Sequence, residues 1–128
     1  IDGATVKGNH NVAVIAGYME TAGCTIENCH VKNATVKAYH ATADACGDKV
    51  GGIVGHAGND GVVVKDCTVV NSAIYAGRDA GQVAGAAKAV NVINCSAASV
   101  TVAVNPDTTC TDGSAGNNIR EEVIGRLL

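Results

Sequence analysis

Short runs of alternating apolar and polar residues follow one another along the chain, and one pattern occurs three times. Each copy has an apolar pair before a glycine and, further on, a polar residue before a cysteine: Ile15-Ala16-Gly17 with Asn28-Cys29, Ile53-Val54-Gly55 with Asp66-Cys67, and Val83-Ala84-Gly85 with Asn94-Cys95. The offset in numbering between the first two copies is the same, 38, at the glycine (17 and 55) and at the cysteine (29 and 67). Such a repeat predicts a stack of similar units.

The third copy is shorter, because its offset from the second is 30 at the glycine (55 and 85) but only 28 at the cysteine (67 and 95). The two-residue deletion therefore falls between glycine and cysteine, in the part of the repeat that reads Ala57-Gly58-Asn59-Asp60-Gly61 in the second copy. Glycine and short polar residues are typical of a turn. We expect a loop to absorb the deletion, with the flanking strands unchanged.

The alternation predicts three short strands in each repeat. They cover residues 12–17, 24–31 and 34–38 in the first, 50–55, 62–69 and 72–76 in the second, and 81–85, 90–97 and 99–104 in the third. Because successive side chains of a strand point to opposite faces, the apolar positions should form inward columns in which like residues stack. These columns are Ile15/Ile53/Val83, Ile26/Val64/Val92, Cys29/Cys67/Cys95, Val31/Val69/Ala97 and Val36/Ile74/Val102.

The predicted fold class is therefore all-β: a right-handed parallel β-helix, or solenoid, of about three coils, none of them stable alone. We expect one domain over residues 1–128, with repeats at about 12–49, 50–79 and 80–104. Residues 4–7 match residues 34–37, which suggests that the numbered chain begins inside an earlier coil and belongs to a larger polypeptide.

The last segment, 105–128, is predicted to be a loop followed by a short helix. Its apolar groups lie three to five residues apart over 118–128, with Asn118 as a possible N-cap and Glu121 at the N3 position. An amphipathic helix could cover the apolar end and the open strand edges of the last coil. A helix that leads into a downstream domain is the alternative.

Three sets of residues are expected at turns. Gly17, Gly55 and Gly85 recur where the chain turns from the first strand, where glycine would permit a positive φ. Short polar side chains tolerate left-handed conformations at a bend and bond the local backbone. Two such bends are expected, at Asn28/Asp66/Asn94 and at Asn33/Asn71/Ser99.

Composition supports a narrow interior. The chain has no Phe or Trp and only three Tyr, yet 47% of its residues are hydrophobic, mostly Val, Ile and Ala. A net charge of −3 with scattered acids and bases leaves no basic patch for phosphates, so nucleic acid is not an expected partner. No apolar run approaches the roughly 20 residues of a membrane-spanning helix. The N-terminus shows neither an initiating Met nor a signal-peptide pattern, and a targeting segment could have been removed.

Gly52-Ile53-Val54-Gly55, followed by the strand 63–69 and the stretch 71–74, resembles the GLUG repeat of bacterial surface and secreted proteins. The resemblance covers most of residues 12–104, although Val14 and Gln82 replace the first glycine in the other two copies. It implies a β-solenoid segment of a large extracellular, adhesin-like protein, and it carries no catalytic residues.

The six cysteines have two kinds of setting. Cys29, Cys67 and Cys95 are predicted to be small apolar fillers with free thiols, although a disulfide within their column stays open. Cys24 aligns with Val62 and Val90 and is expected to be buried as well. Cys46 and Cys110 lie outside the repeat positions, and a bridge between them is conceivable but unsupported by the pattern.

No motif indicates a metal, a cofactor or a catalytic nucleophile. Cys24-x₄-Cys29 with His30 matches zinc-ligand spacing poorly. The histidines, interpreted as surface or turn residues without a nearby nucleophile, are His10, His30, His40 and His56. The acids Asp44, Asp48, Asp60 and Asp79 fall in predicted loops. Because β-helix enzymes that act on polysaccharides gather such groups across adjacent coils, an enzyme remains an alternative.

One outward column offers weak candidates for ligand binding. Thr5, Thr35, Ala73 and Thr101 should form a row beside Lys7, Lys37, Tyr75 and Ala103. A flat threonine row could recognise an ordered surface such as ice or a glycan, but Ala73 interrupts it and lysines flank it. Ordinary β-propensity on a solvated face explains the same row.

These patterns favour a non-enzymatic structural or adhesive module of an exported bacterial protein, extracellular or at the cell surface. Its expected partners are a surface glycan or a host protein. The alternative is a fragment of a polysaccharide-processing β-helix enzyme. Three coils span only about 15 Å at the interstrand spacing, which is too short for the groove of such an enzyme and favours the first hypothesis.

Overall fold

The computed structural model describes residues 1–39, 46–108, 110 and 112–128, and this part of the chain is all-β with parallel strand pairing. One short 3₁₀ turn, Ala89–Asn91, interrupts the strands described. The strands are β1 (Thr5–Gly8), β2 (Ala16–Tyr18), β3 (Thr25–Glu27), β4 (His30–Lys32), β5 (Thr35–Ala38), β6 (Asp48–Val50), β7 (Val54–Ala57), β8 (Val63–Lys65), β9 (Thr68–Ala76), β10 (Arg78–Ala80), β11 (Ala84–Ala87), β12 (Val92–Ile93), β13 (Ser96–Val104) and β14 (Ile124–Leu127).

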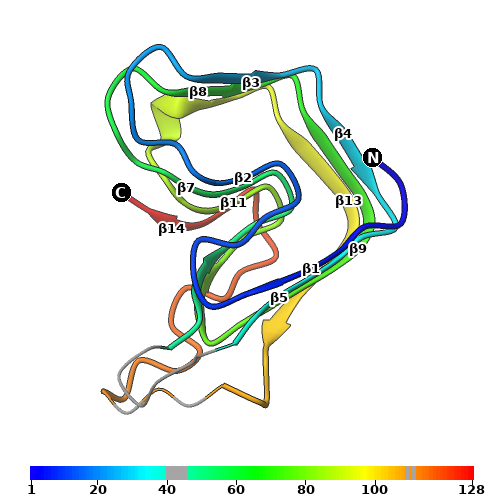
Figure 1. Ribbon diagram of the computed structural model, residues 1–128, viewed down its shortest axis with the longest axis vertical. Helices are drawn as coiled ribbons and strands as arrows, with labels where there is room; N and C mark the ends of the chain where they lie inside the picture. Colours follow the sequence, from blue (N-terminus) through cyan, green and yellow to red (C-terminus); the bar gives the residue numbers. More distant parts are fainter. Residues whose placement is uncertain (40–45, 109, 111) are drawn as a thin grey trace.

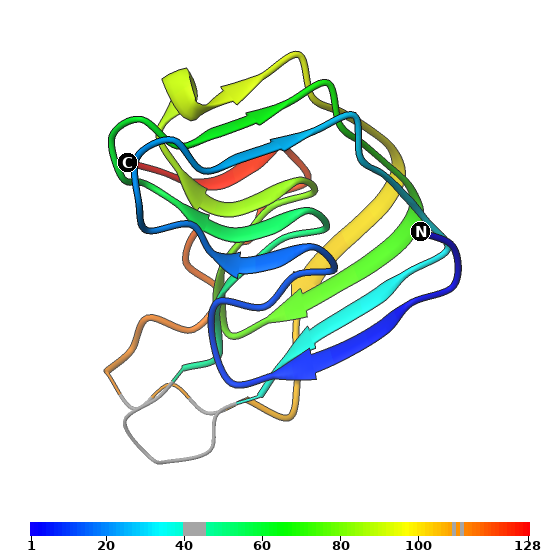
Figure 2. The ribbon, with the colours of Figure 1, turned by 45° about the horizontal axis from the view of Figure 1, so that its top comes forward.

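The strands form four sheets, and each sheet takes its strands from successive repeats in chain order. The long sheet has the order β1-β5-β9-β13, with β4 also paired to β9; the inner sheet has the order β2-β7-β11-β14; the short sheet is β3-β8-β12; and β6 and β10 form the corner pair. Strands of one sheet overlap in Figure 1 and lie side by side in Figure 2. The chain therefore returns to the same sheet once in every repeat.

Strand register confirms the alignment of the repeats. Val64 pairs with Ile26 of the first repeat and with Val92 of the third, which are the offsets expected from the cysteines. Ala57 pairs with Ala87 at the longer offset expected from the glycines. The two-residue deletion thus lies between β7 and β8 in the second repeat and between β11 and β12 in the third. A loop absorbs it, as expected, and the flanking strands keep their pairing.

Burial along the predicted columns shows that each repeat is covered by its neighbours. Cys67 of the middle repeat is fully buried, whereas Cys29 and Cys95 on either side are only partly buried. In the inner sheet, Val83 of the third repeat is also fully buried, like Ile53, because a fourth strand lies beyond it, while Ile15 at the open side is partly buried. The buried interior therefore forms only where one repeat stacks on another.

Cys24 does not follow this pattern. Its carbonyl oxygen accepts a hydrogen bond from the Val63 backbone at 3.0 Å, so its alignment with the second repeat is kept. Its side chain is nevertheless exposed, and Val90 in the third repeat is 76% exposed, whereas Val62 between them is buried. The prediction of burial at Cys24 is wrong, because this position is shielded only in the middle repeat.

Both predicted polar bends adopt the left-handed conformation. The φ values are 53°, 55° and 49° at Asn28, Asp66 and Asn94, and 55°, 48° and 55° at Asn33, Asn71 and Ser99. Side-chain amides also connect equivalent bends, since Asn71 donates to Asn33 at 2.6 Å and Asn94 donates to Asp66 at 2.7 Å. Short polar side chains therefore both tolerate the bend and bond one repeat to the next.

The recurring glycines have a different role from the one expected, because Gly17, Gly55 and Gly85 do not have positive φ. A Cβ on Gly55 would stand 2.5 Å from the carbonyl oxygen of Gly17 and 2.7 Å from that of Lys49. At Gly17 a Cβ would collide with the carbonyl oxygen of Asn11. Glycine is needed because two backbone segments meet closely at an inside corner of the chain path (Figure 1).

The C-terminal capping helix predicted over 118–128 is absent, and a strand takes its place. Ile124–Leu127 form β14, which pairs in parallel with β11, and the backbone amide of Ala84 donates to the carbonyl oxygen of Val123 at 2.9 Å. Val123-Ile124-Gly125 is a fourth copy of the apolar-apolar-Gly pattern. The open edge of β11 supplies backbone partners along its length, which a helix cannot use.

We predict that Ile53→Asp unfolds the protein. Ile53 is fully buried, so the new carboxylate would have no solvent and no partner, at a cost of more than about 4 kcal/mol. Urea unfolding followed by circular dichroism measures this. Val70→Asp is the control, since Val70 is 41% exposed. Equal unfolding midpoints for the two variants would contradict the stacked column.

Candidate functional site

The outward face of the long sheet carries the candidate row of threonines. Thr5 pairs with Thr35, and Ala73 pairs with both Thr35 and Thr101, so these residues occupy equivalent positions on β1, β5, β9 and β13. Thr5 and Thr101 are exposed and Thr35 is partly exposed. The row crosses all four strands and is interrupted once, by alanine.

A second row runs beside the threonines on the same face. Lys7 pairs with Lys37, Lys37 with Tyr75, and Tyr75 with Ala103. The Lys37 ammonium lies 5.2 Å from the centre of the Tyr75 ring, within the range of a cation–π contact. This contact holds an aromatic ring and a cation together at neighbouring positions of the row.

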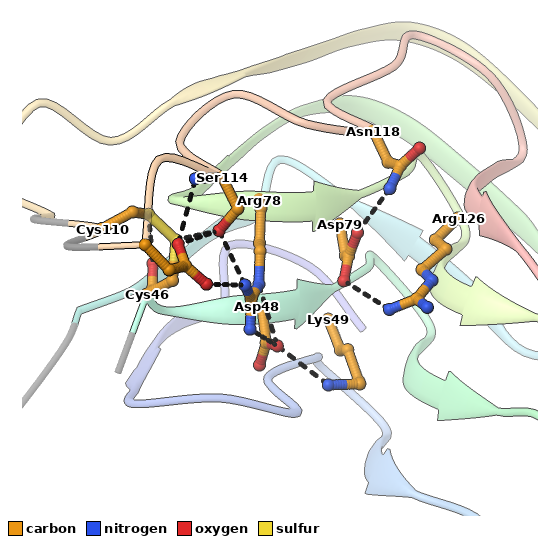
Figure 3. Close-up of polar contacts among 10 residues, drawn as sticks. Cys46, Asp48, Lys49, Arg78, Asp79, Cys110, Ser114, Asn118 and Arg126 are labelled. Atoms are coloured by element: carbon orange, nitrogen blue, oxygen red, sulfur yellow. Dashed lines mark hydrogen bonds and ion pairs between the residues drawn. A yellow bond between two sulfur atoms is a disulfide. The ribbon is translucent and has the colours of Figure 1, made fainter. Parts of the chain in front are cut away.

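The structure also contains a polar cluster around the corner pair that the repeat pattern did not predict (Figure 3). Arg78 of β10 lies opposite Asp48 of β6 in the strand register. Its Nε and Nη2 donate to Asp48 Oδ2 at 3.3 and 3.2 Å, and Lys49 Nζ donates to the same oxygen at 2.8 Å. The Asp48 side chain is only 11% exposed, so two cations compensate a nearly buried carboxylate.

Arg78 also bonds the segment that follows β13. Its Nη1 donates to Asp112 Oδ2 at 3.0 Å and to Ser114 Oγ at 2.7 Å. The backbone amide of Ser114 donates to the other Asp112 oxygen at 3.0 Å. One guanidinium thus connects two strands of the corner pair to a loop.

A disulfide holds the same loop. Cys46 and Cys110 are bonded, with a Cα–Cα distance of 4.6 Å and a sequence separation of 64 (Figure 3). Cys46 lies just before β6, so the bridge ties the loop beside Asp48 and Arg78. The sequence left this bridge conceivable but unsupported, because no periodic pattern relates the two residues.

The column cysteines are free thiols. Cys29, Cys67 and Cys95 are unbonded. Burial raises the pKa of the Cys67 thiol to about 11, so it is protonated at neutral pH. Because the thiolate is the reactive form, Cys67 is a filler rather than a nucleophile.

A pocket of about 320 Å³ lies beside the polar cluster. Asp79 on its wall is almost fully buried and accepts from Asn118 Nδ2 at 2.7 Å, while Arg126 Nη1 lies 3.5 Å from its second oxygen. Arg78 and Ser114 of the polar cluster also line this pocket. Asp79 has φ of 52°, the left-handed conformation that Lys49 adopts at the equivalent position of the second repeat.

Asp48 and Asp112 in this region are both paired with Arg78. Burial raises the pKa of Asp48, but the hydrogen bond and charge of Lys49, followed by those of Arg78, outweigh it, and the pKa lies below the ordinary value of 3.8. Hydrogen bonds from Ser114 lower the pKa of Asp112. A general acid needs a carboxyl that holds its proton near the working pH, and Asp48 and Asp112 are arranged to lose theirs.

The predicted loop acids and turn histidines occupy varied settings. Asp48 and Asp79 lie in strands β6 and β10, contrary to the expectation of loops, while exposed Asp60 pairs with Lys88 outside the strands. His56 stacks on Tyr18 with ring centres 4.7 Å apart. Burial lowers the pKa of His56 below its ordinary value, and the positive charge of Lys49 lowers it further.

His30 Nδ1 lies 2.7 Å from Thr68 Oγ1 at the surface of the long sheet, and His10 is exposed. His40 and Asp44 lie outside the described residues. Across the ranges that the structure describes, no group of three or more His, Cys, Asp or Glu side chains is placed to hold a metal ion. In the same ranges, no helix has the length and apolar character needed to cross a membrane.

One signal in the sequence could have located the cluster. Asp48-Lys49-Val50 aligns with Arg78-Asp79-Ala80 at the offset of the repeat glycines, so opposite charges face each other at two successive positions. Charged residues at equivalent positions of adjacent parallel strands lie side by side. The loop partners, Asp112 and Ser114, had no such signal.

We predict that the charge of Asp48 stabilises the fold above acidic pH. Because its folded pKa is lowered, the stabilisation is present above the unfolded value and is lost as pH falls through the folded value. Asp48→Asn should therefore lower the melting temperature at about pH 6 and differ little from the wild type at about pH 2. A difference that grows on acidification would contradict this assignment.

The disulfide should also stabilise the fold. A bridge that closes a loop of this length contributes about 4 kcal/mol by restricting the unfolded chain. We expect the double variant Cys46→Ser/Cys110→Ser to unfold at a lower urea concentration, whereas Cys24→Ser, which changes an exposed free thiol, should not. An unchanged midpoint in the double variant would show that the bridge contributes nothing.

The chain matches no family model, no curated protein and no solved structure. The functional interpretation of the polar cluster and of the outward rows of the long sheet therefore rests on their geometry alone.

Proposed function

We propose that this chain is a right-handed parallel β-solenoid that serves as a non-enzymatic structural or adhesive module of an exported bacterial surface protein. The fold part of the proposal is supported by the sheet order, in which strands of successive repeats pair in parallel at equivalent positions. Its binding face is the outward side of the long sheet, and its partner is an ordered surface such as a glycan or a host protein.

The observation that carries this function is the pair of in-register rows on the long sheet. Hydroxyl groups of Thr5, Thr35 and Thr101 repeat along one row, and Lys7, Lys37 and Tyr75 follow along the next. Neighbouring strands place such groups about 4.8 Å apart. A regular array of donors, acceptors and one aromatic ring suits a repeating polar surface better than a small substrate.

The resemblance to the GLUG repeat supports the same assignment, because both glycines of its pattern lie where there is no space for a side chain. A Cβ on Gly52 would stand 2.6 Å from the carbonyl oxygen of Gln82 and 2.8 Å from the Val69 methyl groups. Gly55 is closely approached by the backbone of Gly17 and Lys49. Both glycines of the Gly-x-x-Gly pattern are therefore positions where a larger residue does not fit.

The disulfide supports export. Disulfides form and persist in oxidising compartments and are rare in the reducing cytosol. The Cys46–Cys110 bridge joins two segments that also share the Arg78 contacts, so it is part of the folded structure. A protein at the cell surface or outside the cell would keep this bridge.

The polar cluster does not favour the enzyme alternative. A glycoside hydrolase needs one carboxyl that keeps its proton and a second that acts as base or nucleophile. Here Asp48 and Asp112 share Arg78, and the pKa of each carboxyl is lowered. The cluster is best explained as a fastening between the corner pair and the loop.

A glycan-panel binding screen, run beside an assay for released reducing sugar, tests the proposal. We expect Tyr75→Ala to weaken binding about tenfold, since it removes the aromatic ring from the row. Lys37→Ala should weaken it as well. Lys65→Ala is the matched control, because Lys65 lies on β8 of the short sheet and pairs with Glu27.

Binding that is lost equally in Lys65→Ala would place the ligand elsewhere, and release of sugar would favour the enzyme. A host-protein ligand would give no glycan signal, and the same three variants then test capture of that protein on a coated surface.

A further inference from the structure

The outward face of the long sheet differs in charge from the chain as a whole. The chain carries a formal net charge of −3 at pH 7, yet the threonine row and the row beside it contain two lysines, Lys7 and Lys37, and no acid. Beyond the bend, the same sheet carries Lys32, which lies 3.7 Å from Asp2. Unbalanced positive charge is therefore concentrated in the two rows.

The two lysines lie directly opposite each other on neighbouring strands. Lys7 of β1 pairs with Lys37 of β5, at a strand spacing of about 4.8 Å. Like charges at such positions repel each other. Among the residues that the structure describes, neither ammonium group lies within ion-pair distance of a carboxylate, whereas Lys65 on the short sheet lies 2.9 Å from Glu27. An anion that binds between the two ammonium groups would reduce this repulsion.

This face runs along the side of the stack. The strands β1, β5, β9 and β13 lie side by side in Figure 2, and the rows cross them. Val6 and Val36, which alternate with the row residues, pack into the core on the opposite side of the sheet. Further coils stacked on either end would lengthen the rows and would not cover them. The access of a ligand to the rows therefore does not depend on what lies beyond the ends of the stack.

An aromatic ring and hydroxyl groups lie beside the two ammonium groups. Tyr75 pairs with Lys37 in the register, and the Lys37 ammonium lies 5.2 Å from the centre of its ring. Thr5 and Thr35 stand two residues before Lys7 and Lys37 on the same face. The face thus combines positive charge, an apolar ring surface and hydroxyl groups that donate and accept hydrogen bonds. An acidic sugar presents the complementary groups.

We propose that the ligand of this face is an acidic polysaccharide built of uronate units. The inference rests on the proposed function and specifies the chemical class of its glycan. Carboxylates of the ligand bind the ammonium groups of Lys7 and Lys37, its hydroxyl groups form hydrogen bonds with the threonines, and one sugar ring lies against Tyr75. The ligand chain crosses the strands, so that successive units lie over successive strands.

A uronate unit matches the rows in both length and charge. A monosaccharide unit is about as long as the spacing between neighbouring strands, about 4.8 Å. Each uronate unit carries one carboxylate, and β1 and β5 each carry one ammonium group in the row. Sulfated glycans often carry more than one charge on a unit, whereas neither strand has a second cation in the two rows. A neutral glycan would leave both ammonium groups without an anion.

Binding to polygalacturonate, measured beside binding to its methyl ester, tests the proposal. Esterification removes the charge of each unit and keeps the polysaccharide backbone. We expect the acid form to bind at least about tenfold more tightly than the ester. Because salt screens contacts between exposed charges, this difference should decrease as the salt concentration rises. Heparin serves as the sulfated polymer for comparison.

Variants of the two lysines test the position of the ligand. Lys7→Gln and Lys37→Gln should each weaken binding to polygalacturonate about threefold, and the double variant about tenfold, because each substitution removes one exposed ion pair. The double variant should bind the acid form and the ester with similar affinity. Lys65→Gln is the matched control and should bind like the wild type, because Lys65 lies on the short sheet and pairs with Glu27. Circular dichroism verifies that the variants are folded.

The inference and the proposed function fail on different results. Equal binding of polygalacturonate and its ester, binding of neither polymer, tighter binding of heparin, or no effect of the double substitution would overturn the acidic-glycan inference. If Tyr75→Ala still weakens binding to a neutral glycan, the proposed function stands without it. The proposed function itself fails if the Lys65 variant loses binding equally or if sugar is released.

Discussion

Parallel pairing of equivalent strands is the interaction on which the rest of the structure depends. No single repeat buries its own apolar residues, because each contributes only one layer to every column. Ile53 and Cys67 are fully buried where a layer lies on both sides, whereas Ile15, Cys29 and Cys95 are only partly buried at the open sides. The pairing of one repeat with the next therefore provides both the burial of apolar side chains and the backbone hydrogen bonds that stabilise the fold.

The corners of the chain path add a second constraint. Asn28 and Asn33 adopt left-handed φ values at outside bends, and their equivalents in the next repeats do the same. At the inside corner, glycines such as Gly55 allow one backbone to lie against another that carries left-handed residues such as Lys49. Polar ladders such as Asn71 to Asn33 connect the layers at points where side chains cannot be buried.

After β13 the chain no longer follows the repeat. Side-chain contacts hold the loop at this point. The loop that follows is held by the Cys46–Cys110 bridge and by Arg78, which bonds Asp48 on one side and Asp112 on the other. These contacts return the chain to the stack, where β14 covers Val83. The cluster thus preserves the layered order, while the side of the long sheet remains free to present its threonine, lysine and tyrosine rows.

The sequence by itself determined the layers, because repetition specifies which residues stack and alternation specifies which of them point inward. The repeat offsets, the apolar columns and both polar bends are confirmed by the register and the φ values. Tertiary structure alone decided the strand at Ile124–Leu127, the exposure of Cys24 and the bridge from Cys46 to Cys110. The physical reason is that a local pattern of three-to-five-residue spacing fits either a helix or a strand beside a bend, and the open edge of β11 favours the strand. Likewise, the burial of a side chain depends on whether another repeat covers it. The local sequence around a residue does not contain this information.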